Sequence, residues 1–366
     1  MLTHKYLMFH KYLRVKLAPL YGLILAFSLC ISDTLFADIS TLEHIAEAER
    51  EVSYVGIRLK TFISSRGTRT FEEYVIHKPG DTSYRKLVSE VGGRQSLGAT
   101  QDRTERRRDD RRRGRDENNR DDRRREQERN RWRQVKSPFP EKEIQLIAKN
   151  YNLEHSPSDE KIADYDIDIL IITPKFASRP TKHIFFARDN GVILRVEDLD
   201  PEGVLREMSV YTRISFDPET VERKWKKFQQ EIQPEPQRSS SISLAKAEKV
   251  LETKPIQPAY LPPGFQLEDV HNIKGRKNTI HLIYTDGLLG FSIFETTDEP
   301  TRRDRDRHRG SDVIEIEGTH VHKHQRGPTY AFSWSSGDIH FFLFGAMPAT
   351  EMEQVVKSII QKANEK

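Results

Sequence analysis

Cysteine is nearly absent from this sequence of 366 residues, which contains Cys30 alone. Cys30 lies in an N-terminal segment that we expect to be removed on export. The mature chain then has no disulfide, no thiolate nucleophile and no metal site built on cysteine. Such a protein relies on its hydrophobic core, and a chain of about 330 residues is long enough to bury one.

The motifs of common enzyme classes are missing as well. No zincin helix motif, phosphate-binding Gly-rich loop or paired-cysteine ligand set occurs in the sequence. Ser292 stands in "GFSIF", which lacks the second glycine of a nucleophile elbow. We therefore predict that the protein is not an enzyme and needs no cofactor.

The best candidate for a metal site is the segment "THVHKHQ", in which His320, His322 and His324 alternate. Alternate residues of a strand project from one face, and three imidazoles can hold zinc. A tetrahedral site usually draws its ligands from more than one element, so we favour a solvated strand face over a metal site. Protonation of the three rings near pH 6 would add positive charge to that face.

A long hydrophobic run occurs at the N-terminus, where "LAPLYGLILAFSLCIS" follows a basic start. A basic start, a short apolar core and a small residue at the exit are typical of a secretory signal peptide. We predict a signal peptide over 1–37, cleavage between Ala37 and Asp38, and a periplasmic protein. The alternative is an uncleaved membrane anchor, because the run is near the lower length of a spanning helix.

The remaining chain is predicted to form two α+β domains. In the first, 38–232, many strand-like runs with short turns between them follow a helix, which predicts a curved antiparallel sheet or open barrel around helices. The segment "QPEPQRSSSIS" over 233–243 is rich in Pro, Gln and Ser and is interpreted as a linker. The second domain, 244–366, is predicted to be a small antiparallel sheet covered by a C-terminal helix, with Thr350 and Glu353 as its capping box.

The segment "YDIDILIITP" over 165–174 is apolar on both of its faces. One interpretation is that one face packs against a helix while the other lines an apolar cavity. A sheet buried on both faces explains the pattern equally well.

Asp286 and Gly287 separate two apolar β-runs in "TIHLIYTDGLLGFSIF". An Asp-Gly pair in this position is the strongest short signal for a two-residue type I′ hairpin, because both central residues need positive φ. No base or pocket signature accompanies Asp286. We therefore predict that Asp286 and Gly287 turn the chain and carry no catalysis.

Arginine gathers in an insertion over 101–134, which holds fifteen Arg and ten acidic residues interleaved with them. It has too few apolar side chains to offset the entropy of ordering, so we predict a disordered, solvated loop. A nucleic-acid partner is not expected for an exported protein. The loop is either a bare spacer, which we favour, or a contact for anionic lipid head groups or lipopolysaccharide phosphates. The arginine clusters that would make this contact are Arg106, Arg107, Arg108, Arg111, Arg112, Arg113, Arg123, Arg124 and Arg125.

Several segments resemble the RseB/MucB family of periplasmic sigma-E regulators. The second domain supplies "YLPPGF" and "HLIYTDGLLGFSIFE", and the first supplies "YVGIRL", "TFEEYVIHKP", "YRKL" and "IITPKFASRPTKHIFFARDNGVILRVEDLDPEG". The resemblance implies a lipoprotein-carrier-like first domain, which is a half-open β-barrel with helices. It also implies a regulator, not an enzyme, that binds the periplasmic segment of a membrane-anchored anti-sigma factor and senses lipid or lipopolysaccharide. The alternative is a periplasmic carrier or chaperone for lipids or lipoproteins.

Overall fold

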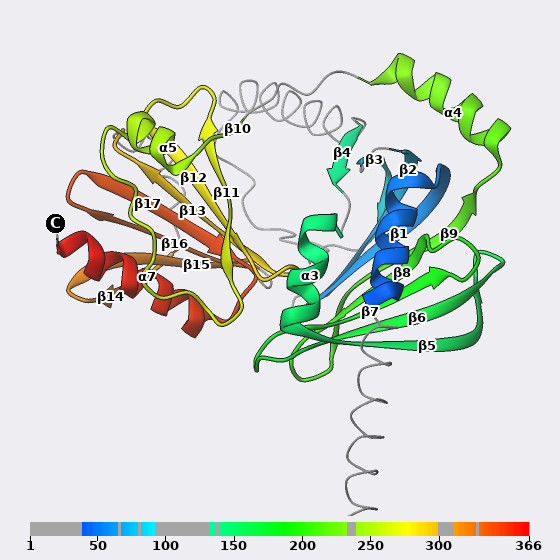
Figure 1. Ribbon diagram of the computed structural model, residues 1–366, viewed down its shortest axis with the longest axis horizontal. Coiled ribbons are helices and arrows are strands. Elements are labelled where there is room, and N and C mark those ends of the chain that lie inside the picture. The colour runs from blue at the N-terminus through cyan, green and yellow to red at the C-terminus, as the bar shows by residue number, and fades with distance from the viewer. Residues whose placement is uncertain are drawn as a thin grey trace, which may run out of the picture.

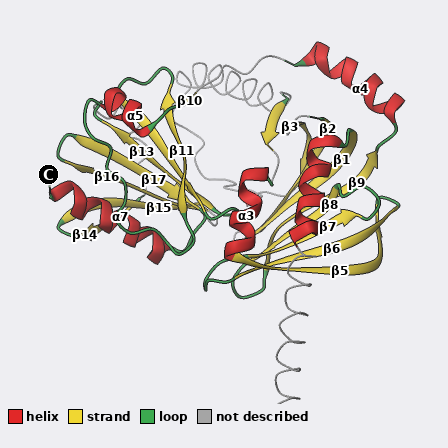
Figure 2. Ribbon diagram, in the orientation of Figure 1, coloured by secondary structure: helices red, strands yellow, loops and turns green. Residues whose placement is uncertain are grey.

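The structure is a computed structural model that describes residues 39–64, 67–79, 82–91, 132–136, 139–232, 239–298, 311–326 and 329–365. These residues form two antiparallel sheets, each packed against helices (Figures 1 and 2). The α+β class predicted from the sequence is confirmed. No helix among the described residues is long and apolar enough to cross a membrane. The predicted signal peptide, with Ala37 and Asp38, lies outside the described residues.

The first sheet has nine strands in the order β4-β3-β2-β1-β9-β8-β7-β6-β5. Every neighbouring pair is antiparallel, so the chain meanders except where β9 returns beside β1. The sheet is open, with β4 and β5 as its two ends. Its strands are β1 (Tyr54–Ser64), β2 (Gly67–Lys78), β3 (Thr82–Val91), β4 (Arg133–Lys136), β5 (Tyr151–Ile162), β6 (Tyr165–Pro174), β7 (Thr181–Ala187), β8 (Ile193–Leu199) and β9 (Leu205–Ser215).

Two helices pack on the concave face of this sheet: a helix over 39–51 and α3 (Glu141–Asn150). Leu42, Ile45 and Ile147 are fully buried and join one cluster with strand residues such as Leu170 and Ile172. The concave face is therefore occupied by side chains of the protein's own helices. Leu170 and Ile172 are therefore on the side of the 165–174 segment that packs against helices.

Helix α4 (Pro218–Glu231) packs on the opposite face, against a cluster that includes Val55 and Ile76. Trp132 is 7% exposed and joins this cluster, and Arg133 begins β4. The predicted end of the Arg-rich insertion at Gln134 is therefore wrong, because the indole is a core side chain. Residues 101–131, including all nine of the arginines named as a polyanion contact, lie outside the described residues.

The second sheet has eight strands in the order β10-β11-β12-β13-β17-β16-β15-β14. One face packs against α5 (Leu244–Leu251) and α7 (Ala349–Asn364), which share a single buried cluster with it. The strands are β10 (Ser239–Ser241), β11 (Gln266–Ile273), β12 (Thr279–Thr285), β13 (Gly290–Thr296), β14 (Asp312–Ile316), β15 (Thr319–Arg326), β16 (Thr329–Ser336) and β17 (Ile339–Gly345).

Two boundaries of this domain differ from the predictions. The predicted linker over 233–243 includes β10, because Ser239–Ser241 pairs with β11. Helix α7 begins after Pro348, without a side-chain cap, so the predicted capping box is wrong. Glu353 instead forms an ion pair with Lys323 at 2.7 Å, which ties the helix to β15.

Candidate functional site at the domain junction

The loop between β12 and β13 projects from the second domain toward the first. Thr285 pairs with Gly290, so the loop has four residues and the predicted two-residue turn is wrong. The Asp286 carboxylate closes the loop, because its Oδ1 accepts from the backbone N–H of Leu288 at 3.0 Å and of Leu289 at 2.8 Å. Gly287 supplies a φ of 104° that few other residues adopt. Asp286 and Gly287 therefore do turn the chain, in a longer loop than expected.

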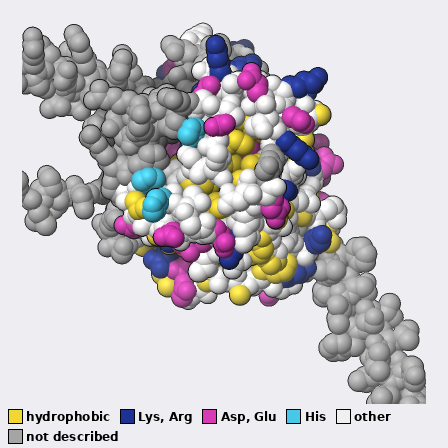
Figure 3. Space-filling view, turned by 90° about the vertical axis from the view of Figure 1, so that its left-hand side faces the viewer, with side chains coloured by type: hydrophobic (Ala, Val, Ile, Leu, Met, Phe, Trp, Pro, Cys, Tyr) yellow, Lys and Arg dark blue, Asp and Glu magenta, His cyan; other side chains and the backbone are white. Residues whose placement is uncertain are grey.

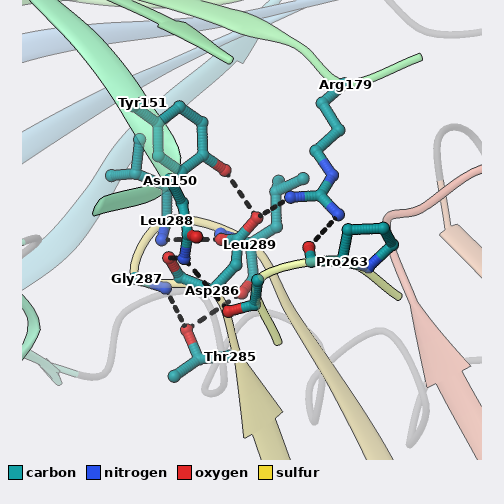
Figure 4. Close-up of polar contacts among 10 residues, drawn as sticks. Asn150, Tyr151, Arg179, Pro263, Thr285, Asp286, Gly287, Leu288 and Leu289 are labelled. Atoms are coloured by element: carbon teal, nitrogen blue, oxygen red, sulfur yellow. Dashed lines mark hydrogen bonds and ion pairs between the residues drawn. The ribbon is translucent and has the colours of Figure 1, made fainter. Parts of the chain in front are cut away.

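The second oxygen of Asp286 reaches into the first domain (Figure 4). Oδ2 accepts from Arg179 Nη1 at 2.9 Å and from the Tyr151 hydroxyl at 2.7 Å. The side chains of Arg179 and Asp286 are both 0% exposed. One carboxylate thus closes a loop of one domain and neutralises a buried cation of the other.

Arg179 lies in the connection between β6 and β7 and is held by both domains. Its guanidinium carbon stands 4.7 Å from the ring centre of Phe176 and 5.2 Å from that of Phe265. Its Nη2 donates to the carbonyl of Pro263 at 2.5 Å. A planar cation suits this position, because it stacks on rings and donates along its edge at the same time.

Asn150, the last residue of α3, makes a second polar contact between the two domains. Its Nδ2 donates to the carbonyls of Gly264 at 3.0 Å and of Asp286 at 2.8 Å. The backbones approach so closely that a Cβ on Gly264 would stand 2.5 Å from Asn150 Oδ1, and one on Gly287 would stand 2.7 Å from Ile147 Cγ1. Both glycines are therefore required by the domain contact as well as by their positive φ.

The electrostatics of the junction favour the hydrogen bonds described above. Burial, and then the charge of Asp286, raises the pKa of Tyr151 far above its usual range, so the phenol stays protonated and donates. Burial also raises the pKa of Glu351 on α7, although Arg179 opposes that rise. Since Arg179 and Asp286 are sealed from solvent, their charges serve to hold the two domains together and are not presented to a substrate.

The three histidines of the candidate metal site lie on β15, as the sequence predicted. Val321, between two of them, is fully buried, so the histidines project from the opposite, outer face of the sheet. His320 and His324 are exposed, and His322 Nδ1 lies 3.1 Å from Ser311 Oγ. Among the residues that the structure describes, no group of three or more side chains is arranged to hold a metal ion.

Sequence reasoning found Asp286 and Gly287 but missed their partners in the first domain. Arg179, Tyr151 and Asn150 carry no local signal, because each becomes important only through a residue more than 100 positions away. One signal was present: three of the segments that resemble the RseB/MucB family supply Arg179, Pro263 and Asp286. The structure brings these segments together at one junction.

No protein-family model matches the chain, and no curated protein matches it. Among solved structures, it is similar to MucB in complex with MucA(peri), with 17% identity, 88% of this chain and 97% of that chain covered, and a TM-score of 0.49. The MucA/MucB complex of Pseudomonas aeruginosa gives 18% identity, coverage of 88% and 98%, and a TM-score of 0.46. A lipoprotein-sorting protein domain from Vibrio parahaemolyticus gives 10% identity over 50% of this chain and 97% of that chain, with a TM-score of 0.19.

Proposed function

We propose that this protein is a periplasmic negative regulator of a sigma-E-type envelope-stress response. It binds the periplasmic segment of a membrane-anchored anti-sigma factor and shields that segment from regulated proteolysis. Lipid or lipopolysaccharide is the signal that weakens this binding. If the ligand prefers the partner-free protein, it lowers the affinity for the partner by the same factor by which the partner lowers the affinity for the ligand.

The observation that supports the proposal is the place of the family-like segments. Three of the segments that resemble the RseB/MucB family contain "YLPPGF", "YTDGL" and "KFASRP", and they meet at the buried pair Arg179–Asp286. Each of these three segments contributes to the same domain contact. A regulator that must present both domains to one partner needs such a fixed joint.

The alternative is a periplasmic carrier of lipids or lipoproteins, and the open nine-stranded sheet favours it. Two features weigh against it. Leu42, Ile45 and Ile147 already fill the concave face, so cargo would have to displace two helices. A pure carrier also has no use for a second domain joined by a buried ion pair.

Two experiments test the proposal. Deletion of the gene should raise the activity of the envelope-stress sigma factor, and the purified protein should capture the membrane anti-sigma factor from solubilised envelopes. Unchanged sigma activity in the deletion strain would contradict the regulator and favour the carrier. Native mass spectrometry of the purified protein separates the two further, because a carrier retains lipid and a regulator retains its protein partner.

A further inference from the structure

The sheet of the second domain has a second face, turned away from α5 and α7. Side chains alternate between the two faces of a strand, so the residues that do not join the buried cluster lie on this outer face. Pairing registers place one row of them across the whole sheet. The row is Ser241, His271, His281, Phe294, Phe342, Ser333, His322 and Val313.

Aromatic rings form the centre of this face. His281 stacks on Phe294 with ring centres 4.1 Å apart and an angle of 9° between the planes. Phe294 stacks on Phe344 at 6.0 Å, and Phe342 and Phe344 lie 5.6 Å apart. All four side chains are half-buried, so part of each ring surface stays open. We call His281, Phe294, Phe342 and Phe344 the aromatic platform.

The surroundings of the platform are polar but nearly uncharged. His271 is held by Asp269 Oδ2 at 2.8 Å from its Nε2 and by Ser239 Oγ at 3.1 Å from its Nδ1. Burial, and then the nearby His271, lowers the pKa of His281 to about 4, so this ring is neutral at the pH of the periplasm. In the view from the side of the second domain, histidine side chains gather near the left of the described surface (Figure 3).

One end of this face is basic. The turn between β11 and β12 exposes Lys274, Arg276 and Lys277, and it adjoins the platform through the start of β12. Asp338, in the turn between β16 and β17, is an exposed carboxylate at the same end of the sheet. Among the described residues at this end, Lys274, Arg276 and Lys277 outnumber Asp298 and Asp338, so an acidic group is attracted to it.

We propose that the aromatic platform is the docking surface for a polypeptide segment that lays apolar side chains on the rings and acidic residues against the Lys274–Lys277 turn. This inference rests on the proposed function, in which the partner is the periplasmic segment of an anti-sigma factor. Aromatic enrichment and a scarcity of charge at the centre are typical of protein-binding surfaces. Ser292 lies opposite Phe344 and Ser333 lies opposite Phe342, so small polar residues stand beside the rings.

Binding of a fluorescein-labelled synthetic peptide, which spans the periplasmic segment of the organism's own anti-sigma factor, tests this surface by anisotropy. The double variant Phe294→Gln/Phe342→Gln should weaken the Kd at least tenfold. The matched control is Phe62→Gln on β1, a phenylalanine of the first domain that is 38% exposed. The control should change the Kd by less than about twofold, since a scattered surface ring contributes little.

A second pair of variants keeps the test valid if the double phenylalanine variant fails to fold. Lys274→Glu/Lys277→Glu should weaken binding several-fold and make it less sensitive to salt. The control is Lys226→Glu/Lys227→Glu on α4, whose side chains are also exposed, and it should bind as the unaltered protein does.

The outcomes separate the two proposals. If the unaltered protein does not bind the peptide, the proposed function fails and the docking surface with it. If the unaltered protein binds and the folded variants of both pairs bind equally well, the docking surface is wrong while the proposed function stands. If the phenylalanine variant loses binding to phosphatidylglycerol vesicles and keeps its binding to the peptide, the surface takes lipid and our inference is overturned.

Discussion

The guanidinium of Arg179 donates to the carboxylate of Asp286 across 2.9 Å, and neither side chain is exposed to solvent. The two residues belong to different domains and lie 107 positions apart in the chain. A buried charge pair is costly to form and more costly to break, because loss of one partner leaves the other charge without compensation. The orientation of the two domains therefore depends on this pair.

Replacement of Asp286 should destabilise the protein strongly. In Asp286→Ala, Arg179 stays buried without its counter-charge, and the Tyr151 hydroxyl loses its acceptor. We expect a loss of roughly 3–5 kcal/mol in the free energy of unfolding, measured with urea. The matched control is Lys142→Ala, which removes the exposed ion pair to Glu268 at the same junction and should cost less than about 1 kcal/mol. Equal effects of the two variants would show that the buried pair does not govern the junction.

Gly287→Ala should separate domain docking from backbone strain. Alanine at this position meets the positive φ of 104° and also places its Cβ 2.7 Å from Ile147 Cγ1. Gly275 has a φ of 83°, and a Cβ added there would have no atom of the described residues within 4 Å, so Gly275→Ala carries the backbone strain alone. We expect Gly287→Ala to lower the melting temperature clearly more than Gly275→Ala. Similar melting temperatures would mean that the close approach of Gly287 to Ile147 of α3 does not contribute to stability.

Glu49 should make stability depend on pH. Burial raises its pKa to about 7, against the opposing effects of Arg58 and the Ile193 backbone N–H. The folded protein therefore holds a proton that the unfolded chain, with a glutamate pKa of about 4.3, has released. This contribution to stability is complete below the unfolded pKa and is lost as the pH rises through about 7, by up to about 3 kcal/mol.

Urea unfolding at pH 5.5 and pH 8.0 measures this dependence. Glu49→Gln, which mimics the protonated acid, should reduce the difference in stability between the two pH values. Glu47→Gln on the exposed side of the same helix is the control and should leave the difference unchanged. A pH profile that stays the same in Glu49→Gln would contradict the assignment to this residue.

The end of the Arg-rich insertion offers another test. Excision of 101–131 keeps Trp132, whose Nε1 donates to Glu231 at 3.1 Å and whose ring packs on Phe228. We expect nearly unchanged thermal stability after this excision, whereas excision of 101–134 also removes a buried tryptophan and should cost about 3–5 kcal/mol. If the shorter excision leaves binding to lipopolysaccharide unaltered, the nine arginines are part of a spacer; a loss of binding identifies them as a polyanion contact.

The sequence was informative where structure depends on near neighbours. The alternation of apolar residues predicted an antiparallel sheet in each domain, and Asp286-Gly287 predicted a turn. It failed where a contact joins distant segments. Trp132 was assigned to a disordered loop because its neighbours are arginines, yet it is buried against α4. Arg179 gave no local sign of its role, because its counter-charge comes from the other domain.

The pairing of β10 with β11 has a practical consequence for dividing this protein. Three serines, Ser239–Ser241, cover the outer edge of the second sheet, although they belong by composition to the linker. A fragment that begins at Leu244 would leave His271, Asn272 and Ile273 of β11 without their strand partners, where a second chain can add as a strand. A fragment that begins at or before Ser239 retains this edge strand, so we expect it to self-associate less than one that begins at Leu244.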